Sequence, residues 1–377
     1  MTLITVTAGV GVALALMVPV ASAARDIRPD ADLCAEISAL ASGQELVLAP
    51  GEYQGPCAIR RGGEPGAPLV IRGADPARPP RILYDGRTTN VFEVRASHVV
   101  IRGLEFGPTQ TGVDAVRLFA ANDVVVEDCR FGGLGGIAVV ANHASLDGLT
   151  VRRNIIRDTK ATAMYFGCHN GTTCIVGRLV VEGNYIRGVT APDPAIGYGI
   201  EVKLNSSAVI RDNVIIDTKG PGIMVFGARE LARGSLIERN VVIGSRTSSG
   251  IVVGGGPAVV RNNLALLNGE AGVGLEDYQR RALLRAITVI ANTVYKNAAG
   301  GITAPEGGLR DVAIINNAAH APAGRRVLPA PQPGLEVLSN VDCTGVPCFA
   351  NPDGMDFSPF PGSLLTGRGV LRGQGSM

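Results

Sequence analysis

The sequence predicts an all-β chain folded as a single-stranded right-handed parallel β-helix, and three observations support this. An inward position recurs every 23 to 30 residues, and an aliphatic residue precedes each such position by three places. Most of the recurring residues are asparagine, whose amides can form a ladder when they stack about 4.8 Å apart. Such a period is typical of a solenoid, whose neighbouring coils bury a common core. The nine positions are Leu104, Cys129, Asn154, Asn184, Asn213, Asn240, Asn263, Asn292 and Asn317.

Composition agrees with this fold and bounds the function. The chain has 377 residues, 50 of them glycine and none tryptophan, which suits tight corners between short strands in one long domain. Its net charge is only +2, and it contains no basic run with interleaved aromatic residues. Nucleic-acid binding is therefore not expected.

The first 23 residues have the pattern of a signal peptide. They are uncharged and apolar, and they end in Val20-Ala21-Ser22-Ala23, a small-residue cleavage signal. No lysine or arginine precedes the apolar stretch, so an uncleaved membrane anchor is the alternative. After cleavage the chain has no further membrane-inserting segment, and we expect a monomer exported to the periplasm or the extracellular space.

Seven cysteines fit an oxidising compartment. Proximity in the chain suggests three pairs, although sequence alone leaves the connectivity open. The suggested pairs are Cys34 with Cys57, Cys168 with Cys174, and Cys343 with Cys348. The remaining Cys129 stands at a ladder position, where we expect a buried free thiol that packs as a small hydrophobe.

The elements follow in a simple order. Residues 32–41 are expected to form a short helix that caps the open end of the solenoid and protects its strand edges. Coils then follow one another to about Asn317, giving a β-helix over residues 24–320. Prolines interrupt the strand pattern in residues 321–377, which we expect to form an irregular tail that folds back over one face.

A second strand in each coil, usually introduced by Gly-Ile, presents side chains outward on one face. One outward column is expected to run Arg117, Ala138, Tyr165, Glu201, Met224. Lys203 shares the face of Glu201, and Tyr165 is expected about 5 Å from Glu201 on the neighbouring coil. The two longest repeats place loops at 167–178 and 189–198 on either side of this polar patch.

This patch suits proton abstraction beside a uronate carboxylate. Lys203 is the candidate base and Tyr165 the candidate acid. Glu201 and Asp193 are candidate ligands for calcium, which would neutralise the substrate. The remaining candidate substrate contacts are His169, Arg117, Phe226 and Arg229.

Simpler explanations exist for five of these candidates. The Glu201 and Lys203 side chains can be solvated surface charges, and Tyr165 can be packing under the 167–178 loop. His169 can be an ordinary solvent-facing histidine. Phe226 can be apolar surface that the tail covers.

Two motifs resemble a known group. Leu48-Ala49-Pro50-Gly51-Glu52-Tyr53 with residues 66–73, and Pro347-Cys348-Phe349-Ala350-Asn351-Pro352, are similar to the opening and closing segments of secreted bacterial β-helix proteins, including the chondroitinase B and alginate lyase family. The resemblance implies a lysine base in the setting of Lys203. It also implies an arginine on the next coil, where this chain has Phe226, with Arg229 three residues further on.

Three functions remain open at this point. The first is an exported polysaccharide lyase that acts by β-elimination on an anionic glycan. The second is a non-catalytic periplasmic or cell-surface β-helix that binds glycan or protein partners, as the missing arginine and the apolar Met224 and Phe226 would favour. The third is a hydrolase that uses Glu201 and Asp193 as its carboxylate pair.

Overall fold

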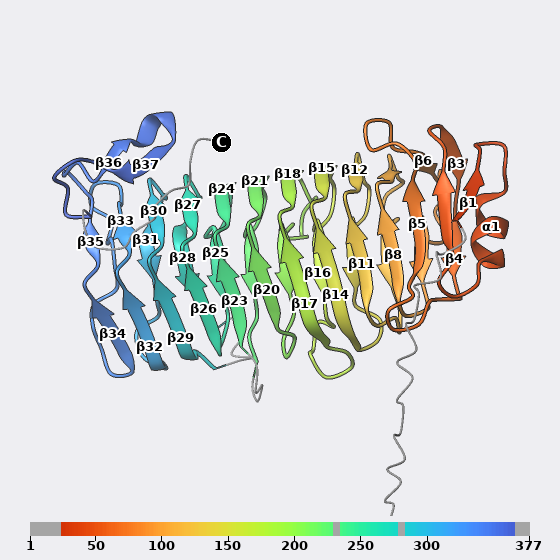
Figure 1. Ribbon diagram of the computed structural model, residues 1–377. Helices are drawn as coiled ribbons and strands as arrows, with labels where there is room; N and C mark the ends of the chain where they lie inside the picture. Colours follow the sequence, from red (N-terminus) through yellow and green to blue (C-terminus); the bar gives the residue numbers. More distant parts are fainter. Residues whose placement is uncertain (1–23, 229–233, 278–282, 366–377) are drawn as a thin grey trace, which may run out of the picture.

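A computed structural model of the chain describes residues 24–228, 234–277 and 283–365. The chain winds into a stack of coils, and each coil contributes strands to three long parallel sheets (Figure 1). The sequence prediction of a parallel β-helix is therefore confirmed. The first sheet, called sheet A, contains in stacking order β1 (Ala24–Ile27), β2 (Glu45–Leu48), β5 (Leu69–Gly73), β8 (Val99–Arg102), β11 (Val124–Glu127), β14 (Leu146–Arg152), β17 (Val176–Glu182), β20 (Ala208–Arg211), β23 (Ser235–Glu238), β26 (Ala258–Arg261), β29 (Arg285–Ile290), β32 (Arg310–Ile315) and β34 (Leu335–Leu338).

Two further sheets complete each coil. Sheet B contains β3 (Glu52–Gln54), β6 (Arg81–Leu83), β9 (Glu105–Phe106), β12 (Arg130–Gly132), β15 (Ile155–Thr159), β18 (Tyr185–Val189), β21 (Val214–Thr218), β24 (Val241–Ser245), β27 (Leu264–Leu266), β30 (Thr293–Tyr295), β33 (Ala318–Ala319) and β35 (Val341–Asp342). Sheet C contains β4 (Cys57–Ile59), β7 (Phe92–Val94), β10 (Val116–Leu118), β13 (Val139–Ala141), β16 (Met164–Phe166), β19 (Ile200–Val202), β22 (Ile223–Val225), β25 (Ile251–Val253), β28 (Ala271–Leu275) and β31 (Gly300–Thr303).

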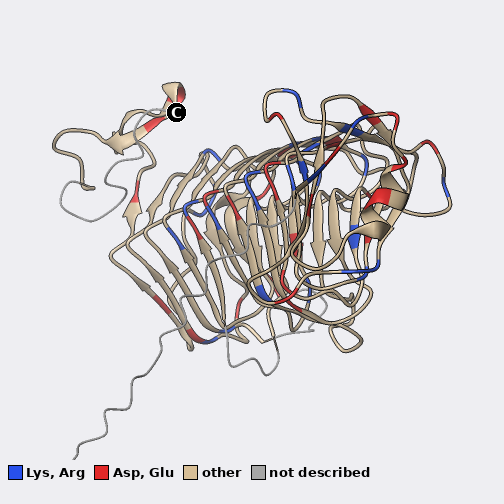
Figure 2. Cartoon of the chain, turned by 45° about the vertical axis from the view of Figure 1, so that its right-hand side comes forward, with Lys and Arg blue, Asp and Glu red and all other residues tan. Residues whose placement is uncertain are grey.

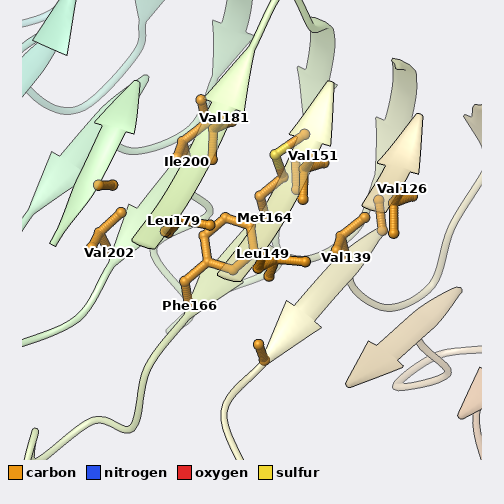
Figure 3. Packing of buried hydrophobic residues seen from close by; sticks show 14 of the residues in the cluster. Val126, Val139, Leu149, Val151, Met164, Phe166, Leu179, Val181, Ile200 and Val202 are labelled. Carbon is orange, nitrogen blue, oxygen red and sulfur yellow. The ribbon is translucent and has the colours of Figure 1, made fainter. Parts of the chain in front are cut away.

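The core lies inside the coils. Side chains of sheet A, such as Val151 and Val181, point toward those of sheet C, such as Met164 and Phe166 (Figure 3). These four side chains are fully buried. Each coil alone exposes this apolar surface, so stacking of coils is what removes it from water.

The asparagine ladder lies at the corner between sheets A and B. From Asn154 onward each Nδ2 donates to the Oδ1 of the next asparagine at 2.8 to 3.0 Å. Each Oδ1 also accepts the backbone N–H of the preceding rung, as Asn213 does from Asn184. The ladder runs one rung further than predicted, to Asn340. The coils continue with it, because β34 and β35 pair with β32 and β33 beyond the expected boundary at residue 320.

A second ladder, which the sequence pattern did not reveal, lies at the corner that follows the sheet B strands. Asn268 Nδ2 donates to Asn297 Oδ1 at 2.8 Å, and Thr218 and Ser245 are hydrogen-bonded at 3.2 Å in the preceding coils. Its members differ in residue type, which hides the repeat in the sequence.

The last residues of successive sheet A strands alternate in charge and form a column along the stack. In register order it consists of Arg102, Glu127, Arg152, Glu182, Arg211, Glu238 and Arg261. Glu127 is 1% exposed and accepts from Arg102 at 2.5 Å and Arg152 at 2.6 Å. Figure 2 shows that basic and acidic segments gather along the edges of the stack. Opposite charges on neighbouring strands stabilise the register of the coils.

The two ends of the solenoid are closed differently. Helix α1 (Leu33–Ala39) is capped at its N-terminus by Asp32, whose carboxylate accepts the N–H groups of Cys34 and Ala35. The helix buries Leu33 and Ile37. An unpredicted strand, β1, precedes it and pairs with β2. At the other end, β36 (Phe349–Asn351), the short 3₁₀ helix η2 (Pro352–Gly354) and β37 (Asp356–Pro359) form a small hairpin.

This hairpin identifies where the tail folds back. Phe349, Phe357 and Leu365 pack on Val241 and Leu264, which are outward residues of sheet B. The tail thus covers the C-terminal half of sheet B, whereas the apolar residues Met224 and Phe226 lie on sheet C.

All three predicted disulfides are present: Cys34–Cys57, Cys168–Cys174 and Cys343–Cys348. Cys34–Cys57 ties α1 to β4. None of the helices in the described ranges has the length and apolarity needed to cross a membrane.

Cys129 is buried and free, as predicted, and its Sγ lies 3.8 Å from the Ile101 carbonyl oxygen, in the place of a ladder amide. Burial raises the pKa of this thiol to about 12. We expect no reaction with a thiol reagent in the native protein and stoichiometric reaction after denaturation, because the thiolate is the nucleophile. Absorbance with a chromogenic disulfide reagent measures both states. Rapid labelling of the native protein would contradict the buried position.

Candidate functional site

The outer face of sheet C brings together the predicted base, acid and carboxylate. Tyr165 is in register with Glu201 on the neighbouring coil, as predicted. Lys203 follows Glu201 by two residues on the same face, while Val202 between them is fully buried in the core. The Nζ of Lys203 lies 2.5 Å from Oε1 of Glu201.

This pair is buried, although it points away from the core. The side chains of Lys203 and Glu201 are only 5% and 2% exposed. Lys203 Nζ lies 5.0 Å from the centre of the Tyr165 ring and 4.2 Å from that of Phe226. The explanation by solvated surface charges is therefore wrong for these two residues, because a cation between two aromatic faces and a carboxylate is largely withdrawn from water.

Burial also changes the acid–base behaviour of the pair. It raises the pKa of Glu201 above its usual value, although the charge of Lys203 and hydrogen bonds from Lys203 and Thr162 act in the opposite direction. Thr162 was not among the sequence candidates, and its position before β16 gives no sequence signal of this contact. The result is a proton-binding group held away from bulk solvent.

Residues from both of the loops predicted at 167–178 and 189–198 lie close to the Lys203–Glu201 pair or to Phe226, which packs on it. Tyr198, at the end of the 189–198 loop, forms an apolar cluster with Met224, Phe226 and two other buried residues. On the other side, Gly167 begins the disulfide-closed loop with φ +91°, and a Cβ there would lie 3.1 Å from the Cβ of Lys203 and 2.5 Å from the Oγ of Ser206. Only glycine lets the loop pass this close to the lysine.

The remaining candidates lie apart from the pair. Arg117 stands two coils from Tyr165 in the same column, about 10 Å away. Its guanidinium donates to Asp114 at 2.5 Å and to Asn142 at 2.8 Å. His169 is exposed in the disulfide loop. Arg229 lies outside the described residues.

The expected column was wrong at one position. Val140, and not Ala138, stands between Arg117 and Tyr165. The reason is that the carboxylate of Asp114 accepts the N–H of Ile137 at 2.8 Å and holds it in a turn, so the strand begins two residues later than the Gly-Ile pattern suggests.

The two predicted calcium ligands each form an ion pair with a different lysine. Glu201 is engaged by Lys203, whereas Asp193 is exposed and accepts from Lys219 Nζ at 2.6 Å. The described residues contain no group of three or more His, Cys, Asp or Glu side chains placed to hold a metal ion. The two carboxylates proposed as a hydrolase pair, Glu201 and Asp193, therefore stand in separate ion pairs.

The sequence candidates did not include a group of flat and charged side chains that lies on the same face, about three coils from Lys203. Toward the N-terminus the same face carries Phe119, whose ring lies 3.7 Å from the Arg95 guanidinium carbon and 4.8 Å from the His143 ring. Phe119 and Arg95 follow β10 and β7, and His143 follows β13. Together with half-buried Tyr165, these residues give the open part of the face both flat and charged groups.

Comparison with known proteins identifies the fold. Residues 176–340 match the family model described as a right-handed β-helix region. No curated protein matches the chain. Among solved structures, the A-module of the mannuronan C-5 epimerase AlgE4 from Azotobacter vinelandii is similar with a TM-score of 0.58 and 15% identity, covering 81% of this chain and 87% of that chain.

Two further structures are similar over a smaller share of their own length. A mutant of the PL6-family alginate lyase AlyGC has a TM-score of 0.55 and 13% identity, covering 89% of this chain and 55% of that chain. The catalytic unit of a GH87 α-1,3-glucanase from Streptomyces thermodiastaticus has a TM-score of 0.55 and 15% identity, covering 82% and 64%. Identities this low establish the fold alone. The three parallel sheets and the match to the β-helix model thus identify this chain as a right-handed parallel β-helix.

Proposed function

We propose that the protein is an exported carbohydrate-active β-helix that cleaves a uronate-containing polysaccharide by β-elimination on the outer face of sheet C. The observation that carries this proposal is the buried Lys203–Glu201 pair beneath Tyr165. Withdrawing two charges from water costs several kcal/mol per ion, so such a pair is a candidate for function and not for stability alone. The similarity to a mannuronan epimerase and an alginate lyase supports an acidic sugar substrate.

From the sequence, Lys203 was the expected base and Tyr165 the expected acid; because Lys203 is buried, the proposed reaction gives both direct contacts with the sugar to Tyr165. In the proposed reaction the tyrosine hydroxyl passes its proton to the Lys203–Glu201 pair, and the phenolate takes the proton from C5 of the uronate. The C4–O4 bond then breaks as the C4–C5 double bond forms, and Tyr165 returns the proton to the leaving O4. Tyr165 is the catalytic residue in this scheme, and Lys203 and Glu201 hold and return its proton.

An ultraviolet assay for unsaturated uronate products tests the proposal on alginate, pectate, glycosaminoglycans and bacterial exopolysaccharides. We expect Tyr165→Phe to lower the rate by about 100-fold or more, which is the usual contribution of a proton-transfer group. Lys160→Met is the control and should keep the wild-type rate, because Lys160 is an exposed lysine that directly follows β15 of sheet B. Parallel reactions with a chelator test the calcium prediction.

A second function, namely glycan binding without cleavage, is also favoured, because Lys203 is buried and the apolar ring of Phe226 packs over it. Two results would decide against the lyase: unchanged product formation by Tyr165→Phe, or no product from any substrate. Retained glycan binding in the latter case would establish the non-catalytic function.

A further inference from the structure

We propose that the protein has a second carbohydrate-binding surface, which binds an acidic polysaccharide on the N-terminal half of sheet B. This surface is called the arginine groove and comprises Arg130, Arg157 and Arg187 with Ile155 and Tyr185. It lies on a different sheet from the Lys203–Glu201 pair, and the proposal holds whether or not sheet C catalyses a reaction.

Register places these five residues in two outward columns on β12, β15 and β18. Arg130, Ile155 and Tyr185 stand in one column, and Arg157 and Arg187 are direct partners in the other. The alternate residues Phe131, Ile156 and Ile186 are buried, which fixes the orientation of the strands. All three arginines are exposed, and Tyr185 is half-buried.

The arginines of this groove lack the carboxylate partners that the arginines of sheet A have. In the described part of the chain, no carboxylate lies within 4.0 Å of Arg130, Arg157 or Arg187, whereas the stacked arginines at the ends of sheet A strands alternate with glutamates. Arg157 and Arg187 stand on adjacent strands, about 5 Å apart, with like charge. Neighbouring like charges are unfavourable, so a bound anion would relieve their repulsion.

The local acidic residues do not neutralise this charge. Glu105 on the groove wall is engaged by Arg81 at 3.2 Å. Asp158 also lines the groove and makes no ion pair with a described residue. Three guanidinium groups therefore face one unengaged carboxylate.

The groove has the size and the surface for a sugar chain. Arg130, Ile155 and Arg157 line a hollow of about 500 Å³, and Arg187 and Tyr185 extend the groove along β18 beyond it. Through Pro108 this hollow adjoins a second one of about 350 Å³ lined by Gln54, Tyr84 and Gln110. The guanidinium carbon of Arg157 lies 5.4 Å from the centre of the Tyr185 ring, and Ile155 is 37% exposed beside it. Guanidinium groups match carboxylates, and flat or apolar side chains match the C–H faces of sugar rings.

The rest of sheet B explains why binding is confined to this half. Its C-terminal half carries Val241, Leu264 and Leu266, which are covered by the tail hairpin. A single-stranded nucleic acid is typically bound by several stacking aromatic residues along a groove, and Tyr185 is the one aromatic residue among the groove's five. Carboxylates repeated along a polysaccharide instead match cations repeated along the coils.

Calorimetric titration with oligogalacturonate and oligomannuronate tests this surface, with a cello-oligosaccharide as the neutral probe. We expect Arg157→Gln/Arg187→Gln to weaken binding of the acidic probes by about tenfold for each lost guanidinium–carboxylate contact. The charge-matched control is Arg310→Gln/Arg326→Gln, which changes two exposed arginines outside the groove and should bind as wild type. Higher salt should weaken the wild-type interaction.

Two further experiments distinguish binding at the arginine groove from binding at sheet C. Tyr165→Phe should retain groove binding, and the groove variant should retain the wild-type rate on short substrates that do not reach sheet B. Equal affinity of wild type and groove variant, or equal loss in the control variant, would overturn the proposal. So would tighter binding of a single-stranded oligonucleotide than of either oligouronate at the same salt concentration.

Discussion

Replacing Lys203 by methionine is expected to lower the free energy of unfolding by about 3–5 kcal/mol at pH 8, the usual cost of leaving one member of a buried ion pair without its partner. Methionine fills the space between the Tyr165 and Phe226 rings, so the effect comes from the carboxylate of Glu201 and not from a cavity. Denaturant unfolding followed by circular dichroism measures it.

The pH dependence of this loss has a definite sign. Burial already raises the pKa of Glu201, and removing the lysine charge raises it further. The folded variant therefore binds a proton that the unfolded chain releases, and the stabilisation from that proton is lost as pH rises through the folded-state pKa. We expect a smaller loss at pH 5 than at pH 8.

A double variant separates charge from packing. Glu201→Gln/Lys203→Met removes both charges and should recover most of the stability at pH 8. If the double variant were as unstable as the single one, the ion pair would not be the source of the loss. The double variant also removes the proposed proton store, so a folded but slow enzyme is the expected result in the lyase assay.

Replacing Asn213 by leucine is expected to destabilise the protein by at least about 2 kcal/mol, because a buried unsatisfied polar group costs about 1–3 kcal/mol and several bonds are lost together. The Asn213 amide donates to the Val181 carbonyl and to Asn240, and it accepts from the backbone N–H and the amide of Asn184. Without it, the buried N–H of Asn184 loses its acceptor. Thermal unfolding measures the difference.

The matched control for this prediction is Asn122→Leu. Asn122 also accepts a backbone N–H from the next coil, that of Asp147 at 2.9 Å, but it is exposed. Water can replace that bond, so little change is expected. Equal melting temperatures for Asn213→Leu and wild type would show that the ladder does not contribute to stability.

The fold was predictable because its determinants repeat. An inward asparagine whose hydrogen bonds are made largely to the coils before and after it leaves a regular signal, and the three disulfides join residues that are close in the chain. The alternating charge of Glu127, Glu182 and Glu238 was equally regular, but it becomes meaningful only when register places each glutamate between arginines.

The site was predictable in part. Alternation along a strand placed Glu201 and Lys203 on one face and Tyr165 beside them. It did not predict their burial, because Tyr198 and Phe226 reach the pair from a loop and from the neighbouring coil. The strand start near Val140 was missed for a related reason, since a side chain of the preceding coil, Asp114, decides it.

The alternating charges at the ends of the sheet A strands also constrain how this chain can change in length. Repeat proteins grow and shrink by whole coils, and the column from Arg102 to Arg261 repeats its sign only every second coil. Losing one coil would bring two glutamates or two arginines face to face, whereas losing two adjacent coils would restore the pairing. Within this segment, coils can therefore be gained or lost in pairs without placing like charges on neighbouring strands.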